Sequence, residues 1–436
     1  MRSCPKTIVS IKAWTTRLSP RKDFALTHLP PPSESPRTEA QNHFFWIDIL
    51  RGLAAFAVVV YHCRVDMWIG FKRIAASPAL YSRFDHWTAY LSAPVPFFRS
   101  GVMLFFLISG FCIHYPYAAG GRDLTLRSYS VRRFFRIYPP YLMAVLIALV
   151  VEYVCFHLVR MPRSAPSKVL QTIFMVQNYG ADPYQMKGDP ALWSLPIELE
   201  LYLLYPIFWA LLQWRGWKVS YTVVCITSFS ALAVILATPM LRDRFQTIGQ
   251  VGNSLMYWVI WCGGAWLAEE IRRGTTNTFL KTELFLAVFS GVVAVSSTAT
   301  NWPIEYQELL WGAFWFLMLR AGLRKAHLLE YLAPNVAKGF ALLGTISYSL
   351  YLIHYPFFKL CSALWLMHFH HQQTNFLVAL LFAVATLPIA YLFYILFERP
   401  FHRMAQRLGR SSERPAAKGV VSETLLSRRP ANNQAS

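Results

Sequence analysis

Charged residues are scarce in this chain. Only 15% of the 436 residues are Asp, Glu, Lys or Arg, and 55% are hydrophobic. A soluble domain usually devotes about a quarter of its residues to charge. The shortfall excludes an ordinary soluble core, and it indicates a chain most of which is surrounded by lipid.

Patterned disulfide and metal-binding residues are also missing. The seven cysteines include no CxxC pair and no regular spacing, so neither a disulfide framework nor a zinc site is predicted. The histidine run from His368 to His371 has no paired carboxylate, and we therefore expect no metal site.

The two ends of the chain lack sustained apolar runs. Residues 1–43 are basic and contain Pro30, Pro31 and Pro32, which argues against a signal peptide. Residues 401–436 are likewise polar and basic. We expect both segments to be disordered cytoplasmic arms that flank a transmembrane domain of residues 44–400.

Between these arms lie apolar segments long enough for spanning helices, which need about 20 residues each. Lys and Arg fall mainly in alternate short connections, while residues 301–303 and 368–375 contain neither. The positive-inside rule therefore explains the net charge of +20 better than nucleic-acid binding does. The expected fold is an all-α polytopic bundle of about ten transmembrane helices with both termini cytoplasmic. The predicted spans are 44–64, 97–118, 138–159, 194–213, 219–239, 251–270, 282–299, 304–321, 342–364 and 376–398, with 169–179 as a weaker re-entrant or interfacial segment.

Two ionisable residues stand in the first predicted span. Arg51 and His62 are eleven positions apart, which places them about 20° apart around a helix and about 16 Å along it. An arginine inside a membrane must face the protein interior or a hydrated cavity, and Asp48 is placed to pair with it. We therefore expect one cavity to accommodate both side chains, with a snorkelling anchor for Arg51 and a packing role for His62 as the alternatives.

Two further spans carry polar groups at helical spacing. Glu198 and Tyr202 are four positions apart, whereas Glu200 points elsewhere. Tyr351 and His354 are three apart and precede Pro356. A solvated helix start for Glu198 and ordinary packing for Tyr351 and His354 are the competing interpretations.

Five short motifs occur in order along the chain. Together they resemble the acyltransferase 3 family of bacterial membrane proteins, over residues 44 to 400. They are Arg51-x10-His62 after Asp48, the segment Gly101–Phe111 with Ser109, the "RR-x-x-R-I-Y-P" element at Arg132, Arg133 and Arg136, "W-S-L-x-x-E-x-x-x-Y" from Trp193 to Tyr202, and "I-S-Y-S-x-Y-L-x-H-x-P" from Ile346 to Pro356, with Glu398-Arg399-Pro400 closing the match. Leu199 stands where the family often has a second acid, so Glu198 is the single candidate carboxylate.

The resemblance implies an enzyme of the bacterial inner membrane with no bound cofactor. It would move an acyl group, usually acetyl, from cytosolic acyl-coenzyme A to a hydroxyl of a carbohydrate or glycolipid acceptor. His62 is then the candidate general base or acyl carrier, with Arg51 and Glu198 as catalytic partners, and Glu198 is expected to orient or charge-balance His62. Asp48, Tyr202, Ser109, Tyr351 and His354 are the expected substrate-binding residues, and Arg132, Arg133 and Arg136 are expected to hold the donor's phosphates.

Two other functions fit the same composition. A proton-coupled transporter also needs buried Arg, His and Glu, although the chain shows no internal repeat. A non-catalytic component of polysaccharide export, working with the assembly machinery, is the second alternative.

Overall fold

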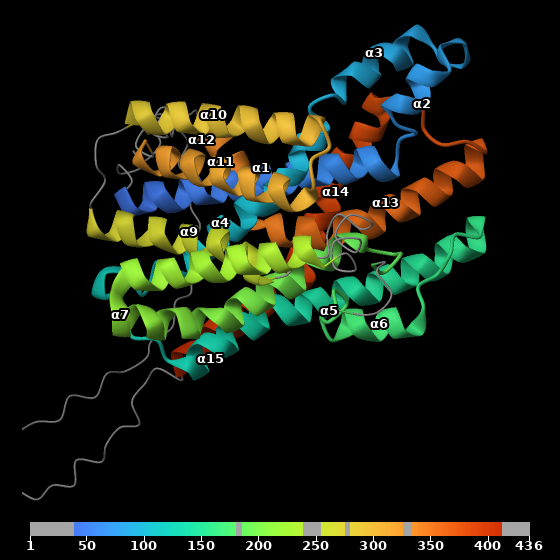
Figure 1. The fold of residues 1–436 in the computed structure, drawn as a ribbon. Coiled ribbons are helices and arrows are strands. Elements are labelled where there is room, and N and C mark those ends of the chain that lie inside the picture. Colours follow the sequence, from blue (N-terminus) through green and yellow to red (C-terminus); the bar gives the residue numbers. More distant parts are fainter. Residues whose placement is uncertain (1–38, 180–184, 239–253, 275–279, 326–333, 412–436) are drawn as a thin grey trace, which may run out of the picture. The chain divides into compact units, whose positions relative to one another are not determined.

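The computed structural model describes residues 39–179, 185–238, 254–274, 280–325 and 334–411. Within these ranges the chain is helical, and the one β-type contact is an isolated bridge between Trp68 and Gln373 (Figure 1). The longer helices are α1 (Glu39–Asp66), α4 (Gly101–His114), α5 (Leu126–Val159), α7 (Ser194–Ala237), α9 (Ser254–Arg273), α10 (Leu280–Ala299), α11 (Ile304–Arg324), α12 (Pro334–Thr345), α13 (Ser347–Phe369), α14 (Phe376–Phe393) and α15 (Arg399–Ser411). Shorter pieces are α2 (Phe71–Ala76), α3 (Arg83–Leu91), α6 (Pro166–Ile173) and the 3-10 turns Pro78–Leu80, Val95–Ser100, Ala118–Gly120 and Pro190–Trp193.

Several helices have the length and apolar character of membrane spans. Among the described residues there are seven such segments, and they establish a multi-pass helical membrane protein. The helices α9 and α11 coincide with two further predicted spans but are not among the seven. The count of ten and the cytoplasmic side of the termini stay predictions. The seven segments are His43–Asp66, Arg83–Gly120, Leu126–Val159, Pro190–Ala237, Lys281–Ala299, Ser347–Phe369 and Phe376–Gly409.

One of these segments is a folded pair. Helix α7 contains Gly216 at φ 72° and ψ 178°, a backbone conformation that glycine adopts readily and other residues avoid. Figure 1 shows the two halves of α7 lying side by side on either side of this turn. They correspond to the predicted spans 194–213 and 219–239, which the sequence separates at the basic residues Arg215 and Lys218.

Helices α4 and α9 cross at a pair of glycines. A Cβ atom added to Gly110 would lie 1.9 Å from the Trp261 carbonyl oxygen, and one added to Gly264 would lie 1.9 Å from that of Leu107. Small residues of this kind let two backbones approach within a membrane. The crossing fixes α4 against α9, and α4 carries Ser109 to the candidate site described below.

Helix α1 packs against α4, α12, α13 and α14. Its contact with α12 is close, because a Cβ atom on Gly344 would lie 2.1 Å from the Asp48 carbonyl oxygen and one on Gly52 2.7 Å from the Gly344 nitrogen. This contact brings the end of α12 beside Arg51. The two glycines therefore set the position of the first functional side chain.

At one end of the helices a compact ion-pair network joins α9, α10 and α11. Arg320 lies 2.5 Å from Glu270 and 2.6 Å from Glu283, and Arg324 lies 3.0 Å and 2.6 Å from the same two carboxylates. We call this end, where Arg136 and Arg273 also lie, the basic end. The other end of the bundle, which holds Asp66 and Phe369, is the opposite end.

The chain's two arms were predicted to be disordered. Residues 399–411 instead form helix α15, which packs against α5, so the prediction of a disordered tail from Phe401 is wrong for this part. The packing explains the difference, because apolar faces of α15 such as Ala405 are buried there. Residues 1–38 and 412–436 lie outside the described residues. The predicted arm also ended later than the structure has it, because α1 begins at Glu39.

Candidate functional site

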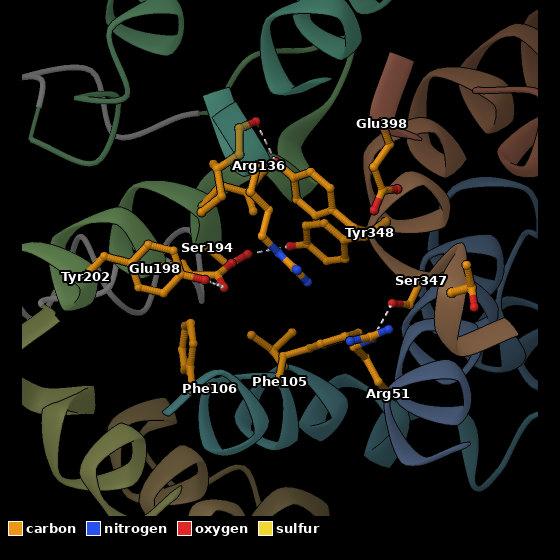
Figure 2. Close-up of a pocket in the computed structure, with 15 residues that line it drawn as sticks. Arg51, Phe105, Phe106, Arg136, Ser194, Glu198, Tyr202, Ser347, Tyr348 and Glu398 are labelled. Carbon is orange, nitrogen blue, oxygen red and sulfur yellow. Dashed lines mark hydrogen bonds between the residues drawn. The ribbon is translucent and has the colours of Figure 1, made fainter. Parts of the chain in front are cut away.

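Six helices and one irregular turn enclose a polar cavity towards the basic end. Its volume of about 90 Å³ is enough for several water molecules. Figure 2 shows the side chains of Arg51 and Arg136 entering it from different helices, with Glu198 beside Tyr202. We call it the arginine cavity, and its lining is Arg51, Val102, Phe105, Phe106, Arg136, Ile137, Ser194, Leu195, Glu198, Tyr202, Thr345, Ser347, Tyr348, Tyr351 and Glu398.

Arg51 is held firmly on its side of this cavity. Its Nη2 lies 2.9 Å from Asp48 Oδ1 and donates to the Gly344 carbonyl oxygen at 2.6 Å. Its Nε donates to Ser347 Oγ at 3.0 Å. The ion pair with Asp48 is the one that the sequence predicted. A guanidinium fixed by these contacts offers a preorganised positive charge in a hydrated site.

Glu198 and Tyr202 meet on the opposite wall, as their spacing predicts. The Tyr202 hydroxyl donates to Glu198 Oε1 at 2.5 Å, and Ser109 Oγ donates to the same oxygen at 3.1 Å. Trp261 Nε1 donates in turn to Ser109 Oγ at 3.3 Å. Three of the predicted residues therefore form one hydrogen-bonded group. Glu200 points away and accepts from the Tyr179 hydroxyl at 2.7 Å.

The three arginines of α5 have different surroundings. Arg136 reaches into the arginine cavity (Figure 2). The guanidinium carbon of Arg133 lies 5.6 Å from the ring centroid of Tyr202, which places it beside the Glu198 group. Arg132 instead packs along Gly409 of α15. Of the three residues predicted to bind phosphate, Arg136 therefore lines the cavity, Arg133 lies against Tyr202 of its wall, and Arg132 lies against α15.

His62 is buried away from the arginine cavity, against His354 of α13. The Nδ1 atom of His62 lies 2.9 Å from Nε2 of His354, and the two rings are stacked with centroids 5.0 Å apart. His354 Nδ1 lies 2.7 Å from the Tyr351 carbonyl oxygen, which only accepts. In a neutral His354 ring, Nδ1 therefore carries the proton and Nε2 accepts from His62 Nδ1. That arrangement leaves a lone pair on Nε2 of His62, as a general base requires.

Tyr351 joins the two halves of the site. Its side chain lines the arginine cavity, where its hydroxyl donates to the Ala191 carbonyl oxygen at 2.5 Å and lies 2.7 Å from Ser194 Oγ. Its main-chain carbonyl holds His354. Arg51 and His62 both reach α13, at Ser347 and His354, so the predicted common face exists. Only Arg51 lines the arginine cavity, however, so the prediction that one cavity accommodates both side chains is wrong. The idea that Glu198 orients His62 is wrong, because His62 contacts His354 while Glu198 binds Tyr202 and Ser109.

Sequence reasoning missed several cavity residues, among them Tyr348 and Glu398. Tyr348 donates from its hydroxyl to the Ile137 carbonyl oxygen at 2.9 Å. Glu398 Oε2 accepts from Ser349 Oγ at 2.5 Å and from the Ser349 amide at 3.1 Å. Glu398 ends a π-helical turn, Tyr394–Glu398, and such turns often occur at functional sites. The motif Glu398-Arg399-Pro400 was the available signal, although helical periodicity gave none.

Within the ranges that the structure describes, no group of three or more His, Cys, Asp or Glu residues is disposed to hold a metal ion. The groups that the site does offer are two guanidiniums, two carboxylates and a histidine pair. These groups can bind an anion, stabilise an oxyanion and transfer a proton.

Comparison with known proteins assigns this site to a family. The chain is 24% identical to "Peptidoglycan O-acetyltransferase OatA" of Listeria monocytogenes serovar 1/2a (strain ATCC BAA-679 / EGD-e) over 391 residues, which are 82% of this chain and 55% of that protein. It therefore spans about half the length of that relative. It is also 23% identical to "Nodulation protein 10" of Rhizobium leguminosarum bv. viciae over 270 residues, 51% of this chain and 72% of that protein. No solved structure matches.

A family model described as "Acyltransferase domain" matches residues 44–395, which include Arg51, His62, Glu198 and His354. The match covers most of the chain and nearly all of the transmembrane domain predicted from the sequence. Both the motifs and the geometry around them fall inside it. The chain therefore belongs to the acyltransferase 3 family of membrane proteins.

Proposed function

We propose that this protein moves an acyl group, most simply acetyl, from cytosolic acyl-coenzyme A to a hydroxyl of a cell-surface or lipid-linked carbohydrate. The observation that carries the proposal is the histidine pair, which Tyr351 connects to a cavity that holds two guanidiniums. The printed names of the relatives, one of them a peptidoglycan O-acetyltransferase, support a glycan acceptor.

The arginines near the basic end suit the phosphates of an acyl-coenzyme A donor. Taking that end as cytoplasmic follows the positive-inside rule. Arg136 and Arg133 would then meet the phosphates of acyl-coenzyme A, since guanidinium forks bind phosphate bidentately. Arg51, already fixed by Asp48 and Gly344, would lie further along the same donor.

The distance between the two halves of the site suits a long, thin donor. Arg51 and His62 are separated by about 16 Å along α1 at 1.5 Å per residue. A compact anion bound at Arg51 would not reach His62. A thioester at the end of an extended pantetheine arm would, and the arm would pass Tyr351 and Phe105, whose rings lie 6.2 Å apart.

The reaction then requires one proton transfer and one acyl transfer. His62 Nε2 takes the proton of the acceptor hydroxyl as its oxygen attacks the thioester carbonyl carbon. The carbon–sulfur bond breaks, the coenzyme A thiolate leaves, and it receives the proton from the His62 imidazolium. An ester and a free thiol result. Direct transfer needs no acyl-enzyme, although acyl-His62 would be an equally balanced first step.

A labelling experiment tests the proposal. Membrane vesicles containing the protein are supplied with radiolabelled acetyl-coenzyme A, and the label on extracted glycan is counted. We expect the His62→Ala variant to lose the product while it inserts at normal abundance, and the exposed His368→Ala variant to keep it. Undiminished product in the His62→Ala variant would remove His62 from the chemistry. Substrate flux without covalent labelling would favour a transporter.

Donor binding is tested by two arginines of one helix. We expect Arg136→Gln to raise the KM for acetyl-coenzyme A roughly tenfold or more, the loss expected for one charge-assisted contact. Arg132→Gln is the matched control, because Arg132 packs on α15 outside the cavity. Equal effects of the two substitutions would contradict the assignment of Arg136 to the donor.

A further inference from the structure

A second cavity lies between α5 and α13, towards the opposite end from Arg136. Lys359 of α13, Glu152 of α5 and the segment Lys187–Gly188 line it. Its volume is about 250 Å³, larger than that of the arginine cavity. We call it the lysine cavity. None of the roles described above uses it.

Lys359 connects this cavity to the histidine pair. Its ammonium lies 2.5 Å from Asp66 Oδ1, and Asp66 follows His62 by four positions on α1, which is about one helical turn. The same ammonium lies 5.4 Å from the ring centroid of Tyr355, and that ring lies 5.1 Å from the His62 ring. One tyrosine therefore separates the wall of the lysine cavity from the proposed base.

Two carboxylate oxygens beside this wall have unused hydrogen-bonding capacity. Asp66 Oδ2 and Asp189 Oδ2 are both buried and have no hydrogen-bond partner. Asp189 directly follows Gly188, and its other oxygen accepts from the Ala191 amide at 3.1 Å. An unpaired buried carboxylate oxygen is costly, and a hydroxyl donor relieves the cost.

The charges around the lysine cavity favour a neutral ligand. The charged residues that line it are Lys359, Lys187 and Glu152, and Asp66 pairs with Lys359 from outside the lining. Glu152 is occupied as a structural clamp, because it accepts from the amides of Ser164 and Gly188 at 2.9 Å and 2.6 Å. Because Lys359 is already paired with Asp66, a phosphate would have to displace that carboxylate. A hydroxylated ring would find carboxylate acceptors and an ammonium donor, the usual partners of sugar hydroxyls.

We infer that the lysine cavity is the acceptor subsite, where Asp66, Asp189 and Lys359 bind the hydroxyls of a neutral sugar ring. This inference rests on the proposed function. The acceptor reaches His62 from the opposite end, past Tyr355, while the donor arrives from the basic end. The Lys359–Asp66 pair opens as the sugar binds, so that both groups exchange one partner for another instead of becoming unpaired.

Measuring the KM values of the full-length protein in vesicles tests whether the lysine cavity binds the acceptor. The acceptor is glycan extracted from cells that lack this gene, and the donor is radiolabelled acetyl-coenzyme A. We expect the double variant Asp66→Asn, Lys359→Met to raise the KM for glycan roughly tenfold or more, with the KM for the donor unchanged. Removing both members avoids a stranded buried charge, which keeps the variant foldable. Lys72→Met, an exposed lysine of α2, is the matched control.

The outcomes separate this inference from the proposed function. If the wild-type protein labels no glycan, the proposed function fails and the subsite fails with it. If the wild type labels glycan but the folded double variant has an unchanged KM for glycan, only the acceptor subsite is overturned. A rise in the donor KM of the same size would also overturn it, because the effect would then not be specific to the acceptor.

Blocking the cavity gives a second measurement. Met161 and Cys155 both line the lysine cavity, so a Met161→Cys variant is made in a Cys155→Ala background and labelled with a bulky maleimide, with the identically treated Cys155→Ala protein as control. We expect labelling to stop transfer to glycan while the protein still binds radiolabelled acetyl-coenzyme A. Unimpaired transfer after complete labelling, or equal loss of transfer and donor binding, would contradict the inference.

Discussion

His354 offers the sharpest test of the histidine pair, because its role depends on which ring atoms donate. In the structure His354 accepts from His62 Nδ1 at 2.9 Å and donates to the Tyr351 carbonyl at 2.7 Å. A His354→Phe substitution keeps an aromatic ring in the buried space but removes both polar atoms. A His354→Gln substitution keeps one acceptor and one donor on the same side chain.

The size of the effect follows from the proton on His62. Without His354, a proton on Nδ1 of His62 becomes a buried unpaired donor, which costs about 1–3 kcal/mol. The proton then favours Nε2, and the fraction of His62 with a free lone pair on Nε2 falls roughly fivefold to 150-fold. We expect kcat of His354→Phe to fall by that factor with little change in either KM. The His354→Gln variant should recover most of the loss.

The assay is acetyl transfer from radiolabelled acetyl-coenzyme A to glycan in vesicles, normalised to the amount of folded protein. Thermal unfolding in detergent provides the folding control for each variant. Equal activity of the glutamine and phenylalanine variants at equal abundance would refute the reasoning. His354 would then contribute its shape and not its hydrogen bonds. Wild-type activity in His354→Phe would refute it as well.

Three further predictions concern the surrounding structure. Glu198→Gln should lower transfer about tenfold to hundredfold, since it weakens hydrogen bonds to a charged group, while Glu200→Gln, which faces Tyr179, should leave it unchanged in the same assay. Gly344→Ala should destabilise the protein by about 1–3 kcal/mol, because the added methyl group would overpack against α1. Gly339→Ala, which has open space around it, should leave stability unchanged. Thermal unfolding distinguishes the two variants, and equal melting temperatures would contradict the close contact. Arg324→Met should reduce folded abundance, because it leaves two buried glutamates with one cation, at a cost of about 3–5 kcal/mol; normal abundance would show that the network is dispensable.

Helical spacing predicted the local part of the site well. The eleven positions between Arg51 and His62 predicted one face, and both side chains do reach α13. The four positions between Glu198 and Tyr202 predicted their contact, which is a hydrogen bond. These relations are confirmed because a helix has a fixed turn, so residues on the same helix are placed by counting.

Contacts between helices did not follow from the sequence in the same way. His62 and His354 are 292 positions apart, and no periodicity indicates that α1 and α13 meet at those residues. Glu198 was a reasonable partner for His62 by charge alone, yet its oxygens are taken by Tyr202 and Ser109. Which helices are neighbours depends on packing details such as Gly344 against Asp48, which a single sequence does not expose.

An irregular turn of the backbone kept Glu398 from being predicted as a cavity residue. Glu398 is the final residue of the last predicted span, where a charged residue normally marks the end of a helix in the headgroup region. The π-helical turn Tyr394–Glu398 adds a residue to one turn and rotates the side chains after it. Glu398 therefore lines the cavity and accepts from Ser349. A helix projected at a regular 3.6 residues per turn cannot show this.

The separation of the two cavities has a consequence for the proposed reaction. An acyl thioester in a hydrated site is exposed to hydrolysis, since water competes with the acceptor hydroxyl. His62 is only 6% exposed and His354 is fully buried, and neither lines the arginine cavity or the lysine cavity. Water in either cavity is therefore screened from the base, by Tyr351 on one side and by Tyr355 on the other. Under the proposed function, the base meets a hydroxyl only when an acceptor displaces Tyr355, so burial of the histidine pair favours transfer over hydrolysis.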